Sequence, residues 1–192
     1  MLGSPNAFGR FETLSMTALR FAAAVALSVV LGAAAHAQTV YRKDAPPGDT
    51  TPTGGSFSIH FPIPYTDVEL EADDPARSPA IVYMVTGINA EMIMLTATET
   101  PNMGQPPKNL SDLVDIVKQR PGGTVADVKE QNKDGKETLT FSARDNKRSY
   151  YFRYVSAGDA LYAQVIEFPE YERPEATAMK NDFFNSFRII KP

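Results

Sequence analysis

His60 is the only histidine that remains in this 192-residue chain once the N-terminal segment described below is set aside, because the other one is His36. A lone imidazole can act as a general base or as one metal ligand. It cannot form a histidine-rich metal site, and the chain has no cysteine to complete a zinc or thiolate centre. The sequence also lacks a G-x-S-x-G nucleophile elbow and a glycine-rich phosphate loop. We therefore expect His60 to be solvated on the polar face of a strand, and we predict neither an enzyme nor a cofactor.

An acidic stretch offers hard oxygen ligands of the kind that calcium prefers. The alternation in DVELEA places three carboxylates on one face of a strand, and two more follow directly. The spacing is not that of an EF-hand loop, which needs a central glycine and a closing glutamate. Rows of like charge also protect an exposed strand edge from pairing with other chains. A solvated edge is the favoured interpretation, and a calcium site is the alternative, for Asp67, Glu69, Glu71, Asp73 and Asp74.

Three methionines are close together in a predicted hairpin. Met92 and Met94 form a Met-x-Met pair, and Met84 lies on the preceding β-rich run. If the turn is centred near Ile88, Met84 is expected beside Met92 on the partner strand. Thioethers are soft ligands that select Cu(I), but methionine also fills irregular hydrophobic cores. Core packing is favoured, and a Cu(I) site built from Met84, Met92 and Met94 is the alternative.

Aromatic residues dominate the region from Tyr150 to Phe168. Alternation predicts that Tyr150, Phe152 and Tyr154 share one face of a strand and that Tyr151 and Arg153 share the other. Both faces are then largely apolar, which is typical of a sheet that is covered on both sides. Tyrosine and arginine are also enriched at protein interfaces. We predict that Tyr151, Arg153 and Tyr171 are the members exposed for binding.

Residues 1–37 have the form of a secretory signal peptide. Arg20 precedes an apolar run from Phe21 to Ala35, and Ala35-His36-Ala37 has the small-x-small pattern of a cleavage site. The run is shorter than the ~20 residues that a membrane-spanning helix needs. Met16 would give a more compact n-region and is the alternative start of the chain. The sequence predicts a periplasmic or secreted protein with no transmembrane segment after cleavage.

Cleavage after Ala37 changes the formal net charge from −4 to −5, because it removes Arg10, Arg20 and Glu12. A mildly acidic chain without a dense basic cluster is a poor binder of polyanions, so no nucleic acid is expected as a partner. Residues 38–55 are rich in Pro, Gly and Thr and are predicted to be a flexible leader. One α+β domain is predicted over residues 56–192.

The order of predicted elements within that domain is strands, helix, strands, helix. Five of the last ten residues are large and apolar, so the C-terminus is expected to dock as a helix that covers the sheet. Its stripe is predicted to contain Ala176, Met179, Phe183 and Phe187. The predicted ranges are strands at 56–61 and 67–72, a hairpin over 80–98, a helix over 109–120, an antiparallel meander over 124–168, a helix from Pro174 and a short edge strand at 188–190.

A GGSFSIHFP opening, a mid-chain helix, an antiparallel meander and a closing FFNSFRI resemble one family. The chain is similar, over residues 54–190, to the PsbP-like and Mog-like α/β/α sandwich group, which includes many exported bacterial proteins of unknown function. The resemblance implies a non-catalytic protein. PsbP-type members assist an oxygen-evolving photosystem, and Mog-type members bind a small GTPase. It implies no active-site residues for this chain.

The sequence thus predicts an antiparallel sheet flanked by helices in a single α+β domain. The expected function is that of an exported non-enzymatic module that binds a protein or assists an assembly. Its expected partner is another exported or membrane-associated protein. The alternative is a periplasmic protein that binds a small ligand or a metal, either copper or calcium, and a hydrolase is the least favoured class.

Overall fold

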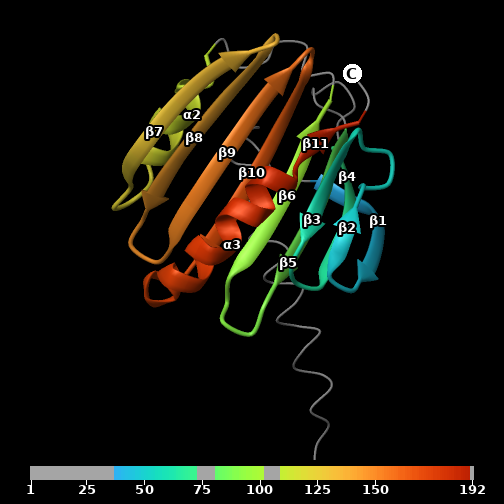
Figure 1. Ribbon diagram of the computed structural model, residues 1–192, viewed down its shortest axis with the longest axis horizontal. Coiled ribbons are helices and arrows are strands. Elements are labelled where there is room, and N and C mark those ends of the chain that lie inside the picture. The colour runs from blue at the N-terminus through green and yellow to red at the C-terminus, as the bar shows by residue number, and fades with distance from the viewer. Residues whose placement is uncertain (1–36, 73–80, 102–108, 191–192) are drawn as a thin grey trace, which may run out of the picture.

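An antiparallel sheet of eight strands forms the body of the molecule (Figure 1). The computed structural model describes residues 37–72, 81–101 and 109–190. Neighbouring strands follow the order β1-β4-β5-β6-β10-β9-β8-β7, so the sheet combines hairpins with two pairings between strands that are not consecutive in the chain, β1 with β4 and β6 with β10. With two helices of four residues or more in the described part, the chain is a sheet-rich single domain. The strands are β1 Ala37–Ala45, β4 Tyr65–Ala72, β5 Ile81–Ile88, β6 Met94–Thr100, β7 Thr124–Lys133, β8 Lys136–Arg144, β9 Ser149–Ala157 and β10 Ala160–Phe168.

The four strands β7 to β10 form the meander that the sequence predicts. Asp134 and Gly135 turn the chain between β7 and β8 with positive φ angles of 54° and 72°, as a two-residue hairpin turn requires. The ladder of the outer strand β7 is interrupted by a bulge after Ala126, next to Asp127 with φ of 56°. A bulge of this kind on an edge strand limits its pairing with other chains.

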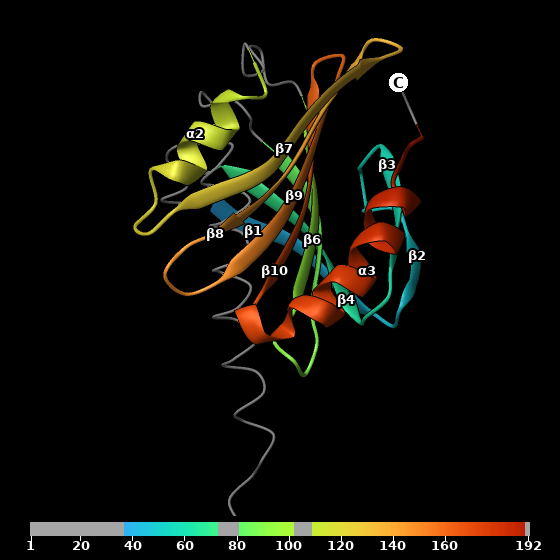
Figure 2. The ribbon, with the colours of Figure 1, turned by 60° about the vertical axis from the view of Figure 1, so that its left-hand side comes forward.

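A smaller sheet and the C-terminal helix cover one face of the large sheet (Figure 2). The smaller sheet has the order β11-β3-β2, with β11 Arg188–Ile189, β3 Phe57–Phe61 and β2 Gly48–Thr50. The 3₁₀ turn η1, Glu170–Glu172, leads into helix α3, Arg173–Ser186. The ring of Phe183 meets Phe61 edge to face at 5.2 Å, and Phe187 lies 5.5 Å from Phe57. The C-terminal aromatic residues are therefore docked, as the sequence predicts.

Helix α2, Asp112–Lys118, packs on the opposite face of the large sheet. Its residues Leu113 and Val117 are 2% exposed and share a core cluster with Phe141 and Phe152 from β8 and β9. The two helices thus lie on different faces, but the second sheet supplies much of the cover beside α3. The prediction of a sheet flanked by helices is therefore confirmed only in part.

The prediction of a flexible leader over residues 38–55 is wrong for most of that segment. It forms the edge strand β1, which pairs with β4, and strand β2, which pairs with β3. Because β1 is an edge strand, its side chains are largely exposed and need no apolar alternation. The composition rich in Pro, Gly and Thr, which predicts a flexible segment, belongs here to the segment that forms the solvent-exposed edge strands β1 and β2.

The acidic strand β4 is not an edge, because it lies between β1 and β5. Asp67 is only 7% exposed, and its Oδ2 accepts hydrogen bonds from Thr53 N at 3.0 Å and Thr53 Oγ1 at 2.7 Å. Asp67 therefore holds the segment before β3 against the sheet, which corrects the solvated-edge interpretation. Asp73 and Asp74 lie outside the described residues.

Candidate binding site at one end of the sheet

The turn between β5 and β6 is fixed by hydrogen bonds at both of its ends. Asn89 N donates to Ile93 O at 3.1 Å, and Ile93 N donates to Asn89 Oδ1 at 2.9 Å. Within the turn, Met92 has a φ of 62°, a region that residues with a Cβ rarely adopt. Its side chain is 47% exposed. The turn therefore presents a methionine to solvent in a conformation that the surrounding hydrogen bonds impose.

Arg148 ties this turn to the rest of the sheet. Its guanidinium donates to the carbonyl oxygen of Met92, and its Nε lies 3.1 Å from Glu167 Oε1 near the end of β10. Burial raises the pKa of the Glu167 carboxyl, and the charge of Arg148 opposes that shift. The preceding Asp145 accepts hydrogen bonds from the backbone of Lys147 and Arg148 at 2.8 and 2.9 Å, which fixes the loop that carries Arg148. Hydrogen bonds and an ion pair thus connect the turn, this loop and the end of β10.

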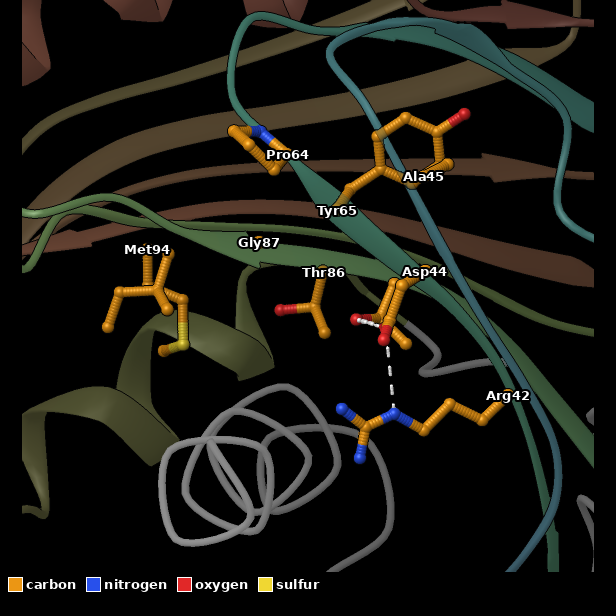
Figure 3. A pocket seen from close by; sticks show the side chains of 10 residues that line it. Arg42, Asp44, Ala45, Pro64, Tyr65, Thr86, Gly87 and Met94 are labelled. Carbon is orange, nitrogen blue, oxygen red and sulfur yellow. Dashed lines mark hydrogen bonds and ion pairs between the residues drawn. The ribbon is translucent and has the colours of Figure 1, made fainter. Parts of the chain in front are cut away.

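A pocket of about 250 Å³ opens beside the turn (Figure 3). Strand register brings its walls together, since Asp44 of β1 faces Thr66 of β4, and Thr66 faces Thr86 of β5. We use the name β5–β6 end for this end of the large sheet, where β5 and β10 finish and β6 begins. The pocket is lined by Arg42, Asp44, Ala45, Pro64, Tyr65, Thr66, Thr86, Gly87, Ile88 and Met94.

The two sides of the pocket differ in chemistry. Figure 3 shows Arg42 and Met94 on either side of Thr86. Arg42 Nε lies 3.6 Å from Asp44 Oδ1, and the same oxygen accepts a hydrogen bond from Thr66 Oγ1 at 2.7 Å. Met94 and Ile88 supply an apolar side. The pocket is thus apolar at one side and carries an exposed ion pair at the other.

Gly87 allows the chain to close the pocket at the turn of Pro62, Ile63 and Pro64. A Cβ at position 87 would run into the carbonyl oxygen of Pro64 and lie 3.3 Å from the Ile63 side chain. Only glycine permits this close approach of two backbone segments. The pocket therefore depends on a glycine at this position.

Large apolar side chains are exposed at this end of the sheet, and one of them, Ile88, lines the pocket. Ile88 is 36% exposed, Met92 is 47% exposed, and Tyr171 of η1 is 77% exposed. The turn η1 follows directly after β10, whose end pairs with the start of β6. Exposed apolar groups beside a pocket are typical of an interaction site.

Of the three residues predicted to be exposed for binding, only Tyr171 is fully so. Tyr151 is 6% exposed, its hydroxyl lies 2.8 Å from Thr177 Oγ1, and Lys180 Nζ lies 4.4 Å from the centre of its ring. Arg153 is partly buried and donates to the carbonyl oxygen of Phe184. Burial, with the nearby charge of Arg188, lowers the pKa of Arg153. The prediction is wrong for Tyr151, because α3 covers that face of β9.

The three methionines do not form one cluster. The register places Met84 opposite Thr98, not beside Met92, because the turn is centred near Ala90 and Glu91. Met94 faces Ile88, four residues from Met84, which corresponds to about 13 Å along a strand. Met84 is 1% exposed and packs with Val68, Leu70 and Val82. The predicted juxtaposition is therefore wrong, and the copper site that depends on it is not formed.

His60 lies on the outer side of β3, where its Nδ1 is 2.7 Å from Asp49 Oδ1 on the paired strand β2. The imidazole is 45% exposed, as expected for a solvated position. Within the described ranges, no three His, Cys, Asp or Glu side chains are placed to hold a metal ion together. Across those same ranges, no helix is long and apolar enough to cross a membrane.

Sequence comparison identifies no matching family model and no matching characterised protein. Among solved structures, the chain is similar to the solution structure of cyanobacterial PsbP (CyanoP) from Synechocystis sp. PCC 6803, at 12% identity, with a TM-score of 0.47, over 83% of this chain and 98% of that one. It is also similar to the crystal structure of LpqN, involved in cell envelope biogenesis of Mycobacterium tuberculosis, at 12% identity, with a TM-score of 0.33, over 81% of this chain and 91% of that one.

Proposed function

We propose that this chain is an exported, non-enzymatic module that binds another exported or membrane-associated protein through the β5–β6 end. The observation that carries this proposal is the set of exposed apolar side chains at that end, where Ile88 lines the pocket, Met92 lies in the adjoining turn and Tyr171 follows the end of β10. Interfaces are enriched in methionine and aromatic residues at their centres. Export is supported by the form of residues 1–37.

The hydrogen bonds of the β5–β6 turn favour this role. The backbone of Met92 is held by the hydrogen bonds of Asn89 and by Arg148, so the turn does not need to be ordered when a partner binds. Preorganisation of this kind reduces the entropic cost of association.

Photo-crosslinking tests the proposal. Benzoylphenylalanine replaces Met92 in one variant, Tyr171 in a second and Val128 in a control, since Val128 is 48% exposed and therefore matches Met92 in exposure. Val128 lies on the outer strand β7. Irradiation is carried out in the exported fraction of the native cells, and adducts are identified by mass spectrometry.

The expected result is one discrete adduct from positions 92 and 171 and none from position 128. Excess unlabelled protein should suppress this adduct, whereas excess Met92→Glu protein should not, because a charge at this position opposes burial in an interface. Equal adducts from all three positions, or none that the unlabelled protein suppresses, would refute binding through the β5–β6 end.

A further inference from the structure

The size of the pocket at the β5–β6 end limits what it can hold. Its volume of about 250 Å³ is smaller than the roughly 300–1,000 Å³ of typical sites for cofactors and drug-sized ligands. An open pocket of this size suits a single side chain of a partner protein.

The inner side of the pocket favours an aliphatic group. Met94 is 7% exposed and Ile88 is 36% exposed. The one hydroxyl between them, that of Thr86, donates to Leu95 O at 3.1 Å and lies 3.0 Å from Thr96 Oγ1. Because this hydroxyl already has partners, an apolar occupant would leave no buried polar group unsatisfied.

The charged side of the pocket favours a cation next to that aliphatic group. The Asp44 side chain is 72% exposed, and that of Arg42 is 37% exposed, so the carboxylate is the more accessible member of the pair. Glu91 adds an exposed carboxylate in the adjoining turn, and the whole chain carries a net charge of −4. Charge complementarity therefore points to a basic partner.

We propose that this pocket receives one aliphatic side chain of the partner and that a lysine or arginine beside it pairs with Asp44. This inference rests on the proposed function and specifies the chemistry of the partner. The recognised element is a short exposed segment in which a leucine-sized side chain adjoins a basic residue. Asp44 selects for the basic residue, and the apolar side of the pocket at Met94 provides the contact area for the aliphatic side chain.

Peptide titration followed by NMR tests this chemistry directly. The probe is the capped peptide Ala-Lys-Leu-Lys-Ala, added to the ¹⁵N-labelled protein. Two comparison peptides replace either the leucine by serine or both lysines by glutamate. The Asp44→Asn variant removes the rim charge. Asp134→Asn is its matched control, because Asp134 is exposed in the β7–β8 turn, and asparagine tolerates its φ of 54°.

We expect saturable shifts at the amides of Thr86, Ile88 and Met94 with the Lys-Leu-Lys peptide. Affinity for the serine and glutamate peptides should be at least ~5-fold weaker. Asp44→Asn should weaken binding of the first peptide by about threefold, and Asp134→Asn should leave it unchanged. The inference is overturned if no saturable shifts occur, if the serine peptide binds equally well, or if both variants have the same effect. A partner crosslinked to Met92 together with absent peptide binding would refute this inference alone, and the proposed function would stand.

Discussion

The side chain of Glu99 accepts two hydrogen bonds from Ser56, one from its backbone N at 2.6 Å and one from its Oγ at 2.8 Å. The Ser56 hydroxyl also lies 2.8 Å from the hydroxyl of Tyr162. Glu99 is only 4% exposed, so these contacts satisfy a carboxylate inside the protein. They fasten the start of β3, and with it the smaller sheet, to the middle of the large sheet.

Replacing Glu99 by glutamine should destabilise the fold by about 1–3 kcal/mol, because the new amide group would face the donors of Ser56. Urea denaturation measures this change as a lower midpoint with an unchanged slope. Glu137→Gln, on the exposed part of β8, serves as the control and should unfold like the wild type. An equal effect of both substitutions would mean that the contact with Ser56 contributes nothing specific.

Of the three methionines Met84, Met92 and Met94, the one in the turn should be oxidised first. Met92 is 47% exposed, whereas Met84 and Met94 are 1% and 7% exposed. Oxidants reach exposed thioethers first, so dilute hydrogen peroxide should convert Met92 to the sulfoxide before the other two. Peptide mass spectrometry at several times gives the three rates. Comparable rates at Met84 and Met92 would show that β5 opens readily.

Gly87→Ala should destabilise the protein by about 1–3 kcal/mol, because the added methyl group would overlap the carbonyl oxygen of Pro64. The turn of Pro62 to Pro64 would have to move away from β5, and NMR should show shifts for Tyr65 and Ile88. Thermal unfolding measures the loss. A variant with the same midpoint and unshifted amides at these positions would contradict the close approach.

Two glutamates near the end of β10 should have pKa values that differ from the ordinary value in opposite directions. Hydrogen bonds from Arg173 and Ser149 lower the pKa of Glu170 to about 2, and burial raises the pKa of Glu167. The lowered pKa of Glu170 contributes stability above its unfolded value of about 4.3, and this contribution is lost as the pH falls toward 2. For Glu167 the sign is reversed, so protonation at acidic pH favours the folded state.

Carboxyl ¹³C titration resolves both residues. Arg173→Ala should bring the pKa of Glu170 back toward its usual value and leave Glu167 unchanged, because the pair with Arg173 at 2.8 Å is lost. Effects on stability should be small, since the side chains of Glu170 and Arg173 are 52% and 45% exposed. An unchanged Glu170 titration in the variant would contradict this ion pair.

The meander and the docked C-terminus were predictable because their signals are strong. Strand β9 is rich in β-forming aromatic residues, and the turn at Asp134 and Gly135 has the residue types that a tight hairpin needs. The apolar stripe of Ala176 and Phe183 indicates a helix with one buried face.

The candidate site was not predictable for a physical reason. Arg42 and Asp44 lie on an edge strand, whose exposed side chains carry no apolar pattern. In the β5–β6 turn, Ile93 is apolar and buried, so in the sequence it resembles a strand residue. The turn was therefore expected near Ile88 and not near Ala90 and Glu91, and the expected register of Met92 was wrong. The burial of Tyr151 depends on where α3 docks, and alternation within β9 does not contain that information.

The pairing of β3 with β11 also sets the time at which the protein can finish folding. Ile189 pairs with Phe57, so the first strand under α3 cannot complete its sheet until the segment that contains Ile189 has been synthesised. Until then, Phe57 and Phe61 also lack the rings of Phe183 and Phe187 that later cover them. The smaller sheet and the aromatic cluster beneath α3 therefore form late in the folding of the chain.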